Sequence, residues 1–152
     1  MLEIREDDLT GEAARALLAL HLADARSNTP TEFSFALDLS GLQQPNITVW
    51  TAWLDGELAG VGALKVLGDG CGEVKSMRTD PRHLRRGVAR ALLDHIVEEA
   101  RRRGLMRLSL ETGTVAAYQP ALALYRQRGF QNGEAFADYQ PSAYNQFLHL
   151  EL

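Results

Sequence analysis

The stretch Glu73-Val-Lys-Ser-Met-Arg-Thr-Asp-Pro-Arg-His-Leu-Arg-Arg-Gly-Val-Ala-Arg-Ala-Leu-Leu93 decides the fold. A strand over 73–79 ends at Asp80-Pro81, a basic loop follows over 82–87, and a helix is predicted over 88–103. The apolar positions of this helix fall on one face at a period of 3.6 residues. The first backbone N–H groups of a helix have no partner within it and lie at the positive end of its dipole. The stretch therefore predicts an anion site.

The basic loop is suited to a polyphosphate. Gly87 has no Cβ, so a phosphate can approach the backbone closely. Four arginines surround the start of the helix: Arg82, Arg85, Arg86 and Arg90. The loop is neither a Walker loop nor a dinucleotide fingerprint, because it lacks Gly-Lys-Ser/Thr and no Gly-x-Gly-x-x-Gly opens the helix. Coenzyme A is the polyphosphate ligand that remains for such a strand–loop–helix arrangement.

The segments on either side predict a mixed α/β protein with a mostly antiparallel sheet. Before the stretch we expect, in order, a strand over 2–6, a helix with Thr10 as its N-cap, a second short helix within 31–42, and strands over 47–54 and 58–67. After it we expect a strand over 105–111, a helix over about 119–128, and strands over 134–139 and 143–152. The strand–helix–strand crossover lies in the middle of the chain, and 152 residues predict a single domain spanning 1–152.

The composition excludes several classes of protein. The formal net charge is −4, but residues 75–103 carry nine cationic and four acidic side chains. A nucleic-acid binder that uses this basic segment is one alternative, which the acidic total disfavours. Cys71 is the single cysteine, which fits the reducing cytoplasm. We see no signal peptide, no membrane span and no metal-ligand spacing among the four histidines.

Residues 84–89, Leu-Arg-Arg-Gly-Val-Ala, resemble the acetyl-CoA signature Arg/Gln-x-x-Gly-x-Gly/Ala of the GCN5-related N-acetyltransferases (GNAT). Gly87 and Ala89 match it, whereas Leu84 stands where Arg or Gln is usual, which leaves the pyrophosphate one side-chain contact short. The stretch Ala121-Leu-Ala-Leu-Tyr-Arg-Gln-Arg-Gly-Phe130 is also similar to the family. The resemblance covers the whole chain in element order, is closest over 73–130, and looks like small bacterial members.

This resemblance implies the GNAT fold, in which the strand–helix–strand core binds acetyl-CoA. It also implies that the acetyl group passes directly to an amine of a small molecule, or to a protein amino group, within a ternary complex. A catalytically inactive CoA-binding regulatory module is the alternative function. The edge strands at the C-terminus leave a homodimer open.

Three catalytic residues are implied by the same resemblance. Tyr125 aligns with the tyrosine that lies beside the thioester sulfur, where its hydroxyl can donate a proton to the departing thiolate. The alternative is a core tyrosine. Glu111 or Glu73 would deprotonate the amine, with a pKa raised by partial burial. The alternative is that these glutamates only pair with nearby cations, such as Lys75.

Binding residues are implied for both substrates. A backbone N–H near Met77 or Arg78 would hold the oxyanion, where the fourth and fifth strands splay and pantetheine lies like an extra strand. The donor contacts are expected from Met77, Arg78, Thr79, Arg82, Arg85, Arg86, Gly87, Val88, Ala89 and Arg90. The acceptor pocket is expected from Phe33, Phe35, Phe136 and Tyr139, for each of which ordinary core packing is the alternative.

Overall fold

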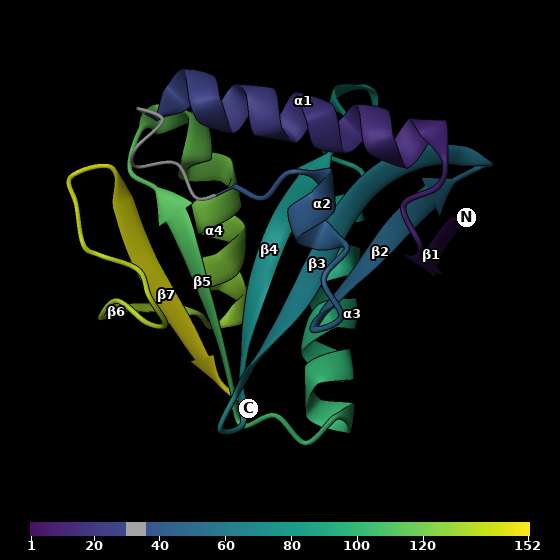
Figure 1. The fold of residues 1–152 in the computed structure, drawn as a ribbon. Coiled ribbons are helices and arrows are strands. Elements are labelled where there is room, and N and C mark those ends of the chain that lie inside the picture. The colour runs from purple at the N-terminus through teal and green to yellow at the C-terminus, as the bar shows by residue number, and fades with distance from the viewer. Residues whose placement is uncertain (30–35) are drawn as a thin grey trace.

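The structure is a computed structural model, and it describes residues 1–29 and 36–152. In these residues one sheet has the strand order β1-β2-β3-β4-β5-β7-β6 (Figure 1). The strands are β1 Leu2–Asp7, β2 Ile47–Leu54, β3 Glu57–Gly68, β4 Cys71–Thr79, β5 Arg107–Gly113, β6 Gln131–Gly133 and β7 Asn145–Glu151. Neighbouring strands are antiparallel except for β4 and β5, which are parallel. The predicted mixed, mostly antiparallel sheet is therefore confirmed.

Helices pack on both faces of the sheet. They are α1 Glu12–Asn28, α2 Leu39–Leu42, α3 Val88–Arg102 and α4 Gln119–Arg128, with 3₁₀ turns η2 Pro81–His83 and η3 Ala116–Tyr118. Leu17 and Leu42 pack with Val61 in the core beneath α1 and α2. Leu92 of α3 and Leu122 of α4 belong to the larger core on the other face. None of the helices in the described ranges is long and apolar enough to cross a membrane.

The sheet opens in its middle, between β4 and β5. These strands pair only where Cys71–Glu73 meet Arg107–Ser109, and beyond that point they diverge (Figure 1). The register of β4 against β3 also shifts between Val61 and Ala63, and Ser76 has a left-handed backbone with φ 57°. Such a bulge bends its strand and re-aims the side chains beside it. The splay expected from the family resemblance is therefore present.

Two local predictions were wrong. The residue at the N-cap of α1 is Gly11 rather than Thr10, and the Thr10 hydroxyl donates a hydrogen bond of 2.7 Å to Asp8. The strand predicted over 134–139 is also absent. Pairing with β7 ends at Gly133, and the chain then turns, with Ala137 at φ 51°.

Candidate active site

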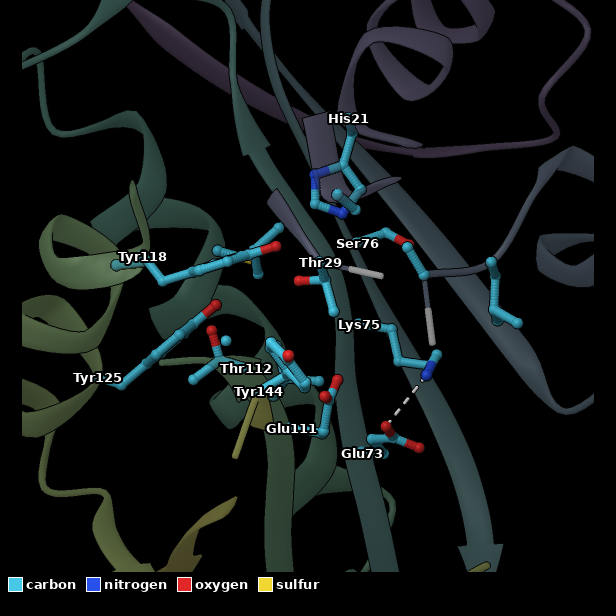
Figure 2. Close-up of a pocket in the computed structure, with 17 residues that line it drawn as sticks. His21, Thr29, Glu73, Lys75, Ser76, Glu111, Thr112, Tyr118, Tyr125 and Tyr144 are labelled. Atoms are coloured by element: carbon cyan, nitrogen blue, oxygen red, sulfur yellow. Dashed lines mark hydrogen bonds and ion pairs between the residues drawn. The ribbon is translucent and has the colours of Figure 1, made fainter. Parts of the chain in front are cut away.

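A cavity of about 120 Å³ lies where β4 and β5 diverge (Figure 2). We call it the carboxylate cavity, because Glu73 of β4 and Glu111 of β5 both line it. Its other polar side chains are His21, Thr29, Lys75, Ser76, Thr112, Tyr118, Tyr125 and Tyr144. The divergence of two strands thus gathers side chains from α1, both strands and α4 around one space.

A second cavity of about 410 Å³, the loop-side cavity, adjoins the first. It extends towards the loop before α3, where Thr79, Pro81, Leu84 and Ala89 line it. The residues that line both cavities are His21, Ala25, Met77, Tyr118, Ala121 and Tyr125. Because they share these walls, two molecules that enter the two cavities would meet between them.

Glu73 is the most deeply buried ionisable group of the site, with 2% of its surface exposed. The Lys75 ammonium donates hydrogen bonds to its carboxylate, at 3.1 Å, and to the Tyr139 hydroxyl, at 2.8 Å. The Tyr139 hydroxyl in turn donates a hydrogen bond of 2.5 Å to the same carboxylate oxygen. Burial, followed by the Glu73 charge, raises the pKa of Tyr139. The charge of Glu73 is therefore balanced by Lys75.

Glu111 faces the same cavity in a different electrostatic setting. Burial raises the pKa of its carboxyl to about 7, with Lys75 opposing this shift and Glu73 adding to it. Its carboxylate forms no hydrogen bond or ion pair with the residues that the structure describes. The carboxyl can therefore accept a proton from a molecule in the cavity near neutral pH.

His21 of α1 is a titratable side chain that lines both cavities. Its burial, together with the neighbouring Arg78, lowers the pKa of the imidazole to about 4. Arg78 is itself held to α1 by an ion pair of 2.5 Å with Asp24. The imidazole is therefore neutral at pH 7, and it is a weaker base than the Glu111 carboxylate.

Tyr125 of α4 lies at the junction of the two cavities. Only 6% of its surface is exposed, and its ring packs edge-on against Phe130 at 5.9 Å between centroids. Burial strongly raises the pKa of the Tyr125 hydroxyl, so it stays protonated at neutral pH. Tyr125 is thus a core tyrosine that also lines both cavities.

The loop before α3 offers free backbone donors. Gly87 precedes the helix at φ 79°, and the first helical hydrogen bond runs from the Ala91 N–H to the Gly87 carbonyl. The N–H groups of Val88, Ala89 and Arg90 therefore have no partner inside the helix. A Cβ on Gly87 would meet no atom within 4 Å, so the backbone here is open to a ligand. This arrangement fits a phosphate group.

The loop side chains differ in how far they are already paired. Arg85 and Arg86 are exposed, and Arg85 has a left-handed backbone at φ 63°. Arg82 forms an ion pair of 3.2 Å with Asp80, and Arg90 lies 3.7 Å from Asp94. The side chain of Val88 is 1% exposed within the core, so only its backbone can contact a ligand.

Two of the four predicted acceptor residues, Phe136 and Tyr139, do not line either cavity. Phe136 and Tyr139 pack edge-on at 5.0 Å between centroids, and both contact Phe147. Neither lines either cavity, although Tyr139 bonds to Glu73, which does. Phe33 and Phe35 lie outside the described residues.

The sequence did not point to three residues that line the site. His21, Tyr118 and Tyr144 line the carboxylate cavity, but no spacing rule connects them. The one signal for Tyr118 is its place two residues before Pro120, at the start of α4. Within the described ranges no group of three or more His, Cys, Asp or Glu side chains could hold a metal ion.

The comparisons with known proteins bear on this geometry. The model of the Acetyltransferase (GNAT) family matches residues 14–130, which is most of the chain. The chain belongs to the GNAT acetyltransferase family. It is therefore an enzyme of the acyltransferase class, and amines are the acceptors of this family.

Individual relatives agree with this assignment. The Escherichia coli (strain K12) protein named uncharacterized N-acetyltransferase YedL is 48% identical, over 100% of this chain and 96% of its own. A crystal structure from Klebsiella pneumoniae, described as an acyl-CoA N-acyltransferase, is 33% identical in sequence. It superposes on this chain with a TM-score of 0.83, and the alignment covers 100% of this chain and 98% of the Klebsiella chain. A Bacillus subtilis acetyltransferase solved with CoA shares the fold, with 20% identity and a TM-score of 0.71 over 100% of this chain and 99% of its own.

Proposed function

We propose that this protein transfers the acetyl group of acetyl-CoA to an amine of a small molecule, or to a protein amino group, by direct attack in a ternary complex. One observation carries the proposal. The loop-side cavity and the carboxylate cavity meet at Met77 and Tyr125, beside the Glu111 carboxyl. A thioester that enters through the first cavity and an amine in the second would therefore lie in contact, which removes most of the entropic cost of bringing them together.

The donor would be held along the open edge of β4 and at the start of α3. Pantetheine would lie between β4 and β5 beside Met77, Arg78 and Thr79, with a backbone N–H of Met77 or Arg78 on the thioester oxygen. The pyrophosphate would accept hydrogen bonds from the N–H groups that follow Gly87. The surrounding side chains are Arg82, Arg85, Arg86, Ala89 and Arg90, of which Arg85 and Arg86 are exposed and make no ion pair with the described residues.

Glu111 would act as the general base. A base works best when its pKa lies near the operating pH, and burial brings the pKa of Glu111 to about 7. Glu73 is instead committed to Lys75 and Tyr139, so it would position its neighbours rather than accept a proton. The Glu111 carboxylate would take a proton from the acceptor ammonium, and the resulting neutral amine would attack the thioester carbon.

Tyr125 would serve the leaving group. As the bond from nitrogen to the carbonyl carbon forms, the carbon–sulfur bond breaks and negative charge gathers on sulfur. Because burial raises the pKa of Tyr125, its hydroxyl keeps its proton and would stabilise the thiolate by donating a hydrogen bond. The Tyr125 hydroxyl would then pass its proton to the sulfur and regain one from the acetylated nitrogen, which must lose its second proton. The products would be the acetylated amine and the free thiol of coenzyme A.

We further propose that residues 1–152 form one domain that acts in the cytoplasm. Strands from both ends of the chain, β1 and β7, belong to the same sheet, which supports the first point. Cys71 is a free thiol, which is in keeping with a reducing compartment.

The test is thiol release on mixing the protein with acetyl-CoA and a panel of amines, scored against the E111Q/Y125F double variant. Release that depends on the amine and is lost in the double variant is the expected result. Calorimetric binding of CoA is measured in parallel. CoA binding without amine-dependent release from any member of the panel would point to the regulatory module instead.

A further inference from the structure

Tyr118 lies at the junction of the two cavities, in a position that a neighbouring glycine permits. Its ring lies over Gly113, the last residue of β5. A Cβ on Gly113 would be 2.2 Å from Cε2 and 2.3 Å from Cδ2 of that ring, which is far inside contact distance. Any residue other than glycine at this position would therefore displace the ring.

The Tyr118 side chain is not explained by core packing or hydrogen bonding. It is only half-buried, and its hydroxyl makes no hydrogen bond with the described residues. Figure 2 shows the ring extending from the α4 side of the cavity towards His21. By contrast, Tyr125 on the same wall belongs to the main core. Tyr118 thus fills space between the two cavities and rests against Gly113.

Three of the other five residues at this junction offer little resistance to a longer acyl chain. Ala25 and Ala121 are small, and Met77 has a flexible side chain that adapts to its neighbours. Tyr125 belongs to the main core, so the bulky side chains outside that core are Tyr118 and His21, and only Tyr118 lies against Gly113. The carboxylate cavity, at about 120 Å³, must also receive the acceptor amine. A longer acyl chain on the donor would therefore compete with both the Tyr118 ring and the amine for the same space.

We propose that Tyr118, seated over Gly113, sets the acyl-chain length that the enzyme accepts and makes acetyl-CoA preferred over propionyl-CoA and butyryl-CoA. This inference rests on the proposed function, which places the thioester where the two cavities meet. A methylene that must displace a wall loses affinity, and single-methylene discrimination in such pockets is about tenfold or more. The Gly113–Tyr118 pair would supply that wall.

The experiment measures binding by calorimetry without an acceptor, so that it does not depend on the identity of the amine. CoA, acetyl-CoA, propionyl-CoA and butyryl-CoA are titrated into the wild type, Tyr118→Ala and the matched control Tyr118→Phe. We expect the wild type and Tyr118→Phe to bind butyryl-CoA at least about tenfold more weakly than acetyl-CoA, since butyryl is longer by two methylene groups. In Tyr118→Ala the two dissociation constants should agree within about twofold, because the wall is gone.

Gly113→Ala tests whether the two residues act together. Its Cβ would displace the ring, so the single variant should also change the ratio of the two dissociation constants. In the Tyr118→Ala background the same change should have no further effect on that ratio. Equal binding of both donors by the wild type, or an unchanged ratio in Tyr118→Ala, would overturn the inference. Failure of every CoA compound to bind would instead refute the proposed donor site.

Discussion

Glu73 and Tyr139 lie 66 residues apart in the sequence, yet the Tyr139 hydroxyl donates a hydrogen bond of 2.5 Å to the Glu73 carboxylate. Lys75 contacts both groups. This network connects the segment between β6 and β7 to β4, and Lys75 balances the charge of Glu73. Glu111 is the cavity carboxylate without a hydrogen-bonded partner among the described residues. The two glutamates therefore differ: Glu73 is held by its neighbours, whereas Glu111, the proposed base, is not.

Removing the charge of Glu73 should destabilise the fold. In Glu73→Gln the buried Lys75 ammonium loses its counter-ion, and breaking a buried pair on one side costs about 3–5 kcal/mol. Urea unfolding at pH 7 measures the change. In E73Q/K75M both charges are gone, so the loss should be clearly smaller than the sum of the two single losses. Additive losses would mean that the two side chains do not interact.

The hydroxyl of Tyr139 should contribute separately to this stability. Tyr139→Phe leaves the ring against Phe136 but removes the hydrogen bond to Glu73. We expect a loss of about 1–3 kcal/mol in the free energy of unfolding, because a buried charged acceptor loses one of its donors. Tyr118→Phe is the matched control, since that hydroxyl has no partner among the described residues, and its stability should stay within about 0.5 kcal/mol.

Glu111→Gln should abolish most of the turnover while CoA binding is retained. Loss of a general base typically lowers the rate by about 10²–10⁴-fold. In the wild type, the turnover rate should rise with pH and level off above about 7, since Glu111 must be ionised to accept a proton. In the variant this rise should disappear. Stopped reactions from pH 5.5 to 8.5 test both points, and a profile shared by wild type and variant would remove Glu111 from the mechanism.

The same carboxyl should make the fold less stable at alkaline pH. Its pKa is raised from 4.5 to about 7 in the folded state, so its favourable contribution is complete below pH 4.5 and is lost as pH rises through 7. The loss amounts to roughly 3 kcal/mol. Glu111→Gln should therefore be more stable than the wild type at pH 8 by up to this amount, and the advantage should shrink towards pH 5. Urea unfolding at both pH values measures it.

Tyr125→Phe separates the two roles of that residue. The phenyl ring keeps the packing against Phe130, so stability should change by less than about 1 kcal/mol. Turnover should fall by about 10–100-fold, because a hydrogen bond to a charged sulfur is worth about 1.5–3 kcal/mol. Single-turnover acetyl transfer measures the chemical step. Unchanged turnover would show that the hydroxyl does not touch the leaving group.

Much of the fold could be predicted because its signals are local. The strand over Ile47–Leu54 and the start of the helix at Val88 follow from β-branched runs, Gly turns and the 3.6-residue period. The alternation over 134–139 looks like a strand, but its backbone turns at Ala137, where Phe136 and Tyr139 pack against β7. Tertiary contacts overrode local pattern at that point.

The candidate site was predicted less completely, because its contacts are long-range. Glu73, Glu111 and Tyr125 do face one cavity, and the family resemblance pointed to all three. Nothing local reveals that Tyr139 would engage Glu73, or that Gly113 makes room for Tyr118. Such pairs depend on how β4, β5 and the later segments meet in space.

The proposed phosphate site at the loop before α3 can be tested by substituting two glycines that have the same backbone conformation. Gly87 and Gly104 flank α3, both have φ 79°, and a Cβ on either would meet no atom within 4 Å. Alanine should therefore destabilise the fold by about 1–2 kcal/mol at each position. Only Gly87→Ala places a methyl group where a pyrophosphate would approach the helix N–H groups, so only it should weaken CoA binding. We expect a loss of about tenfold, comparable to one hydrogen bond to a charged group. Equal CoA affinity in Gly87→Ala and Gly104→Ala, measured by calorimetry, would move the phosphate site away from this loop.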